Sequence, residues 1–231
     1  MAKVHPNSVD VSPPTTTEHE EEEPPPATVL TVWRKSLLFN CDGFTVFDAN
    51  GDLAFRVDSY GIPGRRRAEV VLMDVAGKPL LTVRRKKRLL LGGLTEHWLI
   101  YDGDAAADDD EGTTKRPILS VRRHVSLRSS SGKKALAHVT PIGVVSGEAY
   151  VVEGSYGRRA CRVRDAGNRD AVVAEVRRRK ECLSVGDDVF RLVVADPRRM
   201  GAPLAMGLVI ALDEMFSSSS SGSLLRRTWS A

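Results

Sequence analysis

Apolar and polar residues alternate along most of this chain, in short runs that turn residues separate. In the clearest case Asn50-Gly51 lies between one alternating run at residues 43–48 and another at 53–58. Asn-Gly in this setting is the strongest short-range indication of a β-hairpin, because both residues tolerate a positive φ. The fold class is therefore all-β. Alternation of this kind predicts about twelve strands, over residues 28–32, 43–48, 53–58, 68–74, 79–85, 98–101, 118–127, 135–139, 149–153, 159–164, 171–177 and 189–194.

One stretch near the C-terminus, residues 202–216, departs from this pattern and predicts a helix. Pro203 suits a first helical turn, where the N–H that proline lacks has no helical partner. No charged side chain occurs before Asp213 and Glu214, so the helix has no polar stripe and needs apolar surroundings on all sides. The run is too short for a membrane span, which takes roughly 20 apolar residues. The core positions that we expect to be enclosed are Leu204, Met206, Leu208, Val209, Ile210 and Leu212.

Together the strands and the helix predict a closed antiparallel β-barrel around a C-terminal hydrophobic α-helix. Closure removes the sheet edges at which strands of other chains would pair. A barrel of about twelve strands is too wide for the side chains of its own wall to fill. A helix without a polar face would fill that interior, so we expect residues 202–216 to plug the barrel. The alternative is an ordinary core helix packed against a sheet.

Composition divides the chain of 231 residues into one folded domain and two tails. Residues 1–28 are rich in Glu, Pro and Thr without periodicity, which predicts a disordered acidic tail. Residues 29–216 form the predicted barrel domain, with an acidic loop at 102–116 that we expect to be mobile. Residues 217–231 have the composition of a Ser-rich linker and a basic C-terminal tail.

The charge distribution makes the predicted barrel more basic than the chain as a whole. The formal net charge is +4, while many of the acidic residues lie in the predicted tail at 1–28 and the loop at 102–111. A basic body attracts polyanions such as lipid headgroups and nucleic acid. The alternative is a surface whose charge only maintains solubility.

Cysteine usage and the N-terminal residues bear on the cellular compartment. The three cysteines include no CxxC pair, which argues against a disulfide framework and a zinc site and favours a reducing compartment. Residues 1–28 hold no apolar run of a signal peptide, and their acidity argues against a transit peptide. We expect a cytoplasmic protein that is not secreted, has no transmembrane span, and visits the plasma membrane or the nucleus.

Several stretches in combination resemble the plant LURP-one-related family. They are Val32-Trp33-Arg34-Lys35-Ser36-Leu37, residues 43–48 and 55–60, Leu81-Thr82-Val83-Arg84 with Trp98, and residues 190–194 and 206–215. The resemblance covers about residues 29–216 and implies a tubby C-terminal-like fold, a closed barrel around a hydrophobic helix. It also implies kinship with phospholipid scramblases and with tubby proteins, which bind phosphoinositides at the plasma membrane, and a part in plant defence. Gly92-Gly93-Leu94 and the acidic loop depart from the family pattern, which puts in doubt the transfer of a ligand site near residues 80–100.

Given this resemblance, the densest basic run, at residues 84–88, is a candidate site for anionic lipid. Each Lys or Arg near an anionic membrane surface contributes about 1 kcal/mol to binding. Similar runs occur at residues 65–67, 158–159 and 177–180, and they would form a collar if their strand ends shared one rim. The alternative is a set of solvated strand ends whose charges protect sheet edges. The candidate ligand residues are Arg84, Arg85, Lys86, Lys87, Arg88, Arg122 and Arg123.

Catalysis and direct binding of nucleic acid have little support in the sequence. The five histidines show no metal-ligand spacing, and neither a nucleophile elbow nor a phosphate-binding loop occurs. The basic runs lack the interleaved aromatic residues on which bases stack. We expect a monomeric, non-enzymatic protein without cofactor or metal, which binds an anionic phospholipid surface or protein partners. The alternatives to lipid binding are a protein–protein adaptor in plant defence signalling and a membrane-tethered transcriptional regulator.

Overall fold

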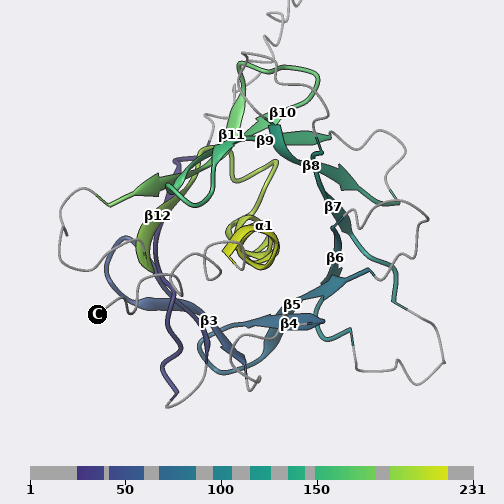
Figure 1. Cartoon of the computed structure of the whole chain (residues 1–231). Helices are drawn as coiled ribbons and strands as arrows, with labels where there is room; N and C mark the ends of the chain where they lie inside the picture. The colour runs from purple at the N-terminus through teal and green to yellow at the C-terminus, as the bar shows by residue number, and fades with distance from the viewer. Residues whose placement is uncertain are drawn as a thin grey trace, which may run out of the picture.

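The computed structural model is a closed barrel of antiparallel strands with one helix inside it (Figure 1). Strands adjacent in sequence pair in the sheet, and β1 pairs with β12 to close the barrel. The structure describes residues 25–38, 42–59, 68–86, 96–105, 115–125, 135–143, 149–179 and 188–217. The strands are β1 (Thr28–Trp33), β2 (Asp42–Phe47), β3 (Leu53–Ser59), β4 (Glu69–Met73), β5 (Pro79–Arg85), β6 (His97–Asp102), β7 (Leu119–Arg123), β8 (Ala135–Pro141), β9 (Tyr150–Ser155), β10 (Ala160–Asp165), β11 (Val172–Arg178) and β12 (Val189–Val194).

The helix α1 (Ala202–Phe216) fills the barrel, and Figure 1 shows it end-on within the ring of strands. The strands contribute alternate, inward-facing apolar residues to one core cluster with the helix. The predicted plug is therefore confirmed. Of its predicted core positions, Met206, Leu208, Val209, Ile210 and Leu212 are buried, and Leu204 is partly buried against the same core. In the described part of the chain, no helix combines the length and the apolar character that crossing a bilayer requires.

All twelve predicted strands are present, and most of their ends lie within two residues of the predicted ones. The exception is β7, which was expected over residues 118–127 and ends at Arg123. His124 N still donates to Leu136 O at 2.8 Å, and residues 126–134 lie outside the described ranges. Most of the predicted N-terminal tail, the C-terminal tail from residue 218, and residues 106–114 of the acidic loop also lie outside them.

The predicted Asn-Gly hairpin joins β2 to β3. Gly51 has a φ of 91°, which glycine adopts without strain. The Asp48 carboxylate accepts hydrogen bonds from the backbone N–H groups of Asn50 and Asp52, at 2.8 and 2.9 Å. A side chain that holds the turn in this way fixes the register of the two strands.

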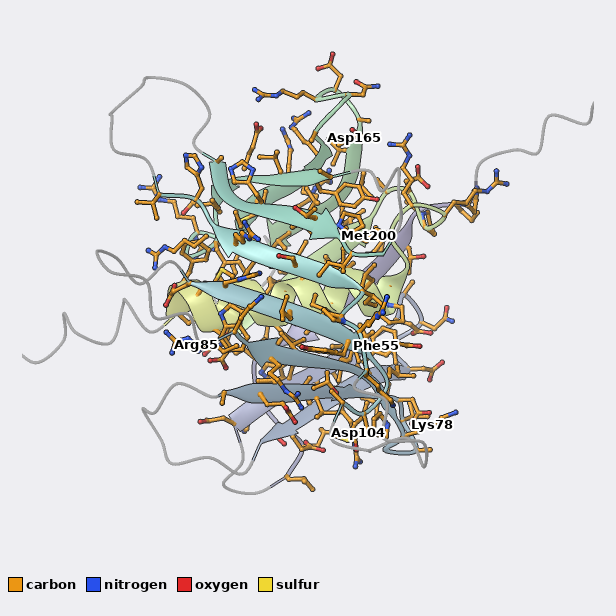
Figure 2. All side chains as sticks on the ribbon, turned by 90° about the vertical axis from the view of Figure 1, so that its right-hand side faces the viewer. Phe55, Lys78, Arg85, Asp104, Asp165 and Met200 are labelled. Atoms are coloured by element: carbon orange, nitrogen blue, oxygen red, sulfur yellow. The ribbon has the colours of Figure 1, made fainter. Side chains whose placement is uncertain are left out.

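The antiparallel order sorts the strand ends onto two rims. Odd-numbered strands end, and even-numbered strands begin, at the rim where α1 ends at Phe216, which we call the exit rim. The opposite rim, where β12 leads to the start of α1 at Ala202, is the entry rim. In Figure 2 Arg85 lies at the exit rim, and Lys78 and Asp104 lie at the entry rim.

Candidate functional site

The basic runs that the structure describes converge on the exit rim, because each lies at or just beyond the end of an odd-numbered strand. The condition for a basic collar, that the strand ends share one rim, is thus met by the runs that the structure describes. Lys87 and Arg88, the run at 65–67 and Lys180 lie outside the described residues. The described members are Arg84, Arg85 and Lys86 on or after β5, Arg122 and Arg123 on β7, Arg158 and Arg159 between β9 and β10, and Arg177, Arg178 and Arg179 on or after β11.

One part of this rim is a buried polar cluster that attaches the end of α1 to the barrel wall. The buried Asp213 lies 3.1 Å from Arg34 Nε through Oδ2 and 3.8 Å from Arg159 Nη1 through Oδ1. The Tyr156 hydroxyl donates to Oδ1 at 3.1 Å, and Ser217 Oγ donates to it at 2.6 Å. The Asp213 carboxylate connects α1 to the residue that follows β1 and to the turn between β9 and β10.

Arg159 is the deepest cation of this cluster, with a side chain only 5% exposed. Its guanidinium lies over two aromatic rings, 4.5 Å from the Tyr156 centroid and 4.4 Å from the Phe190 centroid. Its φ of 51° is in the left-handed region, which the tight turn between β9 and β10 requires. Stacking and the Asp213 carboxylate together compensate for removing this charge from water.

The pKa values in the cluster keep Tyr156 neutral and Arg34 charged. Burial, reinforced by the Asp213 carboxylate, raises the pKa of Tyr156 well above its usual value, so the hydroxyl stays a donor. Partial burial opposes the charge of Arg34, but the adjacent carboxylate outweighs that effect and raises the pKa of Arg34. Tyr156 and Arg34 therefore keep these protonation states across the physiological pH range.

Arg123, a predicted ligand residue, is also engaged in holding the helix. Its Nη1 lies 2.9 Å from Glu96 Oε2 and donates to the carbonyl of Met215 at 3.5 Å. Its guanidinium lies 4.8 Å from the centroid of the Phe216 ring. A cation at the carboxyl end of a helix also interacts favourably with the helix dipole. Arg123 thus stabilises the fold and has less freedom to bind an incoming anion.

The other described candidates differ in how far they are engaged. Arg84 Nε lies 2.5 Å from Glu69 Oε2, and its guanidinium lies 5.4 Å from the ring centroid of Tyr101. Arg85, Lys86 and Arg122 form no ion pair with any residue that the structure describes; Lys86 and Arg122 are exposed and Arg85 is half-buried. These three are the predicted site residues whose charge remains available at the rim.

A cavity of about 280 Å³ opens at the same rim between the end of β1 and the start of β2. Its lining includes the cations Arg34 and Lys35 and the carboxylates of Asp42, Asp188 and Asp213. Because both signs of charge face it, the cavity itself has little preference for an anion. Among the described residues, the unpaired positive charge of this rim lies on the exposed cations around the cavity.

The remaining titratable groups have structural surroundings. His97 lies in β6, and its Nε2 is 2.7 Å from Ser120 Oγ. Cys161 is buried, and burial raises the pKa of its thiol to about 12, so the thiolate needed of a nucleophile does not form at neutral pH. Within the described ranges no three His, Cys, Asp or Glu side chains are grouped to hold a metal ion.

Sequence reasoning missed two further features of the exit rim. The first is the stacking of Arg159 on Tyr156, which is near it in sequence, and on Phe190, which comes from β12. The second is a group of exposed apolar side chains at and after the end of β1, at Trp33, Leu37 and Leu38. The sequence carries a trace of the second, because these apolar residues flank the polar stretch Arg34-Lys35-Ser36.

Comparison with known proteins agrees with the fold and identifies the family. The chain is 43% identical to Protein LURP-one-related 8 of Arabidopsis thaliana over 223 residues, which cover 95% of this chain and 100% of the relative. It is 40% identical to Protein LURP-one-related 17 of the same plant over 197 residues, which cover 82% of this chain and 84% of the relative. Neither name states an enzymatic activity.

A crystal structure of an Arabidopsis thaliana protein has the same fold, with a TM-score of 0.50 and 19% identity over 85% of this chain and 93% of that one. The model of the family described as LURP-one-related matches residues 28–213, which run from the first strand of the barrel to Asp213 in the helix. With a family match across the barrel and such identity to relatives over most of their length, this chain belongs to the LURP-one-related family.

Proposed function

We propose that this protein binds anionic phospholipid, and phosphoinositide in particular, as a peripheral membrane protein through its exit rim. The observation that supports the proposal is the convergence of basic runs from β5, β7, β11 and the β9–β10 turn on one end of the barrel. Arg85, Lys86 and Arg122 add charge there that no described carboxylate neutralises. Both rims also carry carboxylates: at the exit rim Glu69, Glu96 and Asp213 lie in ion pairs with arginines. The entry rim has Asp48, Asp52, Asp74, Asp102, Asp104 and Asp170 among Lys78, Lys115, Arg116 and Arg169.

The three available cations set the expected size of the effect. At about 1 kcal/mol each near an anionic surface, they contribute about 3 kcal/mol to binding. That free energy corresponds to roughly a 150-fold change in the dissociation constant. Because these charges are solvent-accessible, the effect should weaken as ionic strength rises.

Vesicle flotation tests the proposal with the full-length chain. Phosphatidylcholine vesicles with and without phosphoinositide are compared for the wild type and for R85E/K86E/R122E. We expect the wild type to float with phosphoinositide vesicles and the variant to lose at least a hundredfold in affinity. Equal binding of the wild type to neutral vesicles would refute the proposal. The matched control reverses exposed cations on the entry rim, Lys78→Glu, Arg116→Glu and Arg169→Glu, and should bind like the wild type.

The same variants separate lipid binding from the two alternative functions. If the chain is a membrane-bound protein of plant defence signalling, R85E/K86E/R122E should leave the plasma membrane while the entry-rim control remains there. An adaptor recruited by a protein partner should keep its location in both variants. A membrane-tethered transcriptional regulator should move to the nucleus when the exit-rim charge is reversed. Fluorescent fusions imaged in plant cells distinguish these results.

A further inference from the structure

We infer that three side chains, here called the apolar wedge, insert into the lipid layer when the exit rim meets an anionic membrane. They are Trp33 at the end of β1 and Leu37 and Leu38 in the segment that follows it. The inference rests on the proposed function and adds to it a hydrophobic contact. It assigns the orientation of the barrel on the membrane, with the end of α1 facing the lipid. The contact is with acyl chains and the interfacial region, so it is separate from recognition of the headgroup.

The wedge is the densest group of exposed large apolar side chains in the described part of the chain. Trp33 is 37% exposed, Leu37 55% and Leu38 38%, all within six residues at the end of β1. The entry rim has Val75 and Ile142, which are exposed singly and come from different turns. Isolated exposed apolar residues are normal on a protein surface, whereas a cluster at one rim marks an interaction surface.

Hydrogen bonds to the strands hold this turn in place and keep the leucines outside the core. Arg34 N donates to Asp188 O at 2.8 Å, and Thr45 Oγ1 donates to Lys35 O at 2.7 Å. Ser36 is buried; its Oγ donates to Asp58 Oδ1 at 2.6 Å and accepts from Leu38 N at 3.0 Å. Because the backbone of Arg34 and Lys35 is bonded to the neighbouring strands and Ser36 points inward, Leu37 and Leu38 stay in contact with solvent.

The approach of this turn to the barrel wall depends on a glycine in β2. A Cβ atom at Gly43 would lie 1.8 Å from the carbonyl oxygen of Val57 and 3.3 Å from Ser36 Cβ. Any larger residue would push β2 away from β3 and from the turn. The exposed leucines therefore belong to a segment, residues 34–38, whose backbone is packed against the barrel wall.

The residues around the apolar wedge favour an anionic bilayer as its binding partner. Lys35 Nζ lies 5.8 Å from the Trp33 ring centroid, so a cation and an interfacial aromatic ring are adjacent. Tryptophan prefers the boundary between headgroups and acyl chains, and leucine prefers the acyl chains. Interfacial binding combines apolar burial with electrostatic attraction to anionic lipid, and the exit rim supplies both. Arg85, Lys86 and Arg122 complement the negative charge of such a surface.

The first test removes the apolar contact and leaves the charge. Leu37→Ser/Leu38→Ser is compared with the wild type on phosphatidylcholine vesicles that contain phosphatidylserine and phosphoinositide. Burial of two leucine side chains that are about half exposed predicts a loss of roughly ten- to a hundredfold in affinity. The matched control, Val75→Ser/Ile142→Ser on the entry rim, should bind like the wild type. The melting temperature of both variants should be unchanged, because all four side chains are exposed.

The second test locates Trp33 directly. The chain contains three tryptophans, of which Trp98 is buried in the core and Trp229 lies outside the described residues. In a Trp229→Phe background, vesicles with brominated acyl chains should quench a large part of the fluorescence on binding. The same experiment with Trp33→Phe added should show almost no quenching, because Trp98 is shielded by the barrel.

The outcomes separate this inference from the proposed function. If the chain binds anionic vesicles with the expected charge dependence but shows no quenching of Trp33, or no loss in Leu37→Ser/Leu38→Ser, the wedge is refuted and lipid binding stands. If neither protein nor variant binds anionic vesicles, both are refuted. If the leucine variant binds vesicles normally but loses a protein partner, the wedge is a protein-binding surface and the inference is wrong.

Discussion

Removal of the Asp213 carboxylate should destabilise the barrel more than removal of any other polar group on α1. The helix is apolar along most of its length, so dispersion and hydrophobic contacts alone define its axial position and rotation only weakly. Asp213 fixes both, because it binds Arg34, which directly follows β1, and Arg159 at the β9–β10 turn. In Asp213→Ala the guanidinium of Arg159 remains buried without its carboxylate, and Tyr156 loses the acceptor that lies 3.1 Å from its hydroxyl.

The expected cost follows from that environment. Breaking a buried ion pair by removing one partner costs about 3–5 kcal/mol, and a domain of this size has a total stability of about 5–15 kcal/mol. The Arg34 half of the interaction contributes less, because its side chain is 41% exposed and its charge is screened by water. For a domain in this size class, a loss of 3–5 kcal/mol lowers the melting temperature by roughly 6–20 °C.

Urea unfolding followed by circular dichroism, together with thermal melting, measures this cost. Asp213→Asn should lose less than Asp213→Ala, since an amide oxygen still accepts one hydrogen bond. The double variant Asp213→Leu/Arg159→Met removes both charges and should recover much of the stability, as apolar replacements of buried ion pairs do elsewhere. A free energy of unfolding for Asp213→Ala within about 1 kcal/mol of the wild type would refute this account of how the helix is held.

Three further predictions follow from buried and paired groups. Leu208→Asp and Met206→Asp should fail to fold, because a carboxylate on the enclosed helix would have no partner and costs several kcal/mol; a soluble protein with a cooperative melt would contradict this. Cys161 should react with Ellman's reagent only after unfolding, since it is buried and its pKa is about 12. The pKa of His138, measured by NMR titration, should lie below 6.5 because of desolvation and then the neighbouring His124, and should rise in His124→Gln. Since the pKa of His138 is lower in the folded state than in the unfolded state, the stability that His138 contributes should be lost as pH falls below 6.5.

The barrel and its plug were predictable because two independent patterns constrain them. Period-two alternation gives strands with one apolar face, and a helix without any polar face must be enclosed by the protein. The one strand predicted too long, β7, ends at Arg123 although apolar residues recur after it in the sequence. Alternation alone does not show where ladder hydrogen bonds stop, because that depends on the partner strand.

The convergence of the basic runs could also have been derived from the sequence, by counting strands. In a barrel whose neighbours in sequence are neighbours in space, every odd-numbered strand ends at the same rim. Arg84-Arg85 ends the fifth strand and Arg122-Arg123 the seventh, whereas Arg177-Arg178 ends the eleventh. Predicting that these runs share a rim therefore needs only the number of strands and a closed barrel in which sequence neighbours pair. Identifying which of these arginines pair with carboxylates needs the three-dimensional structure.

The Asp213 cluster could not be derived in that way. Arg34 and Asp213 are 179 positions apart, and Tyr156 and Asp213 are 57 apart, so no local pattern relates them. Their contact depends on the rotation of α1 about its own axis, and an all-apolar helix gives no sequence indication of that rotation. The left-handed backbone of Arg159, which directs its side chain inward, has no sequence marker either.

The exit rim combines two sets of cations that have different physical roles, and this makes the proposed function testable. Arg34, Arg123 and Arg159 hold the end of the helix, so their substitution should lower stability whatever the protein binds. Arg85 and Arg122 form no ion pair with described residues, so their reversal should leave the fold intact. A loss of vesicle binding in variants of Arg85 and Arg122 therefore cannot be ascribed to unfolding. If loss of binding instead followed only the first set, the rim would matter through the stability of the barrel, and attraction of lipid by its charge would be excluded.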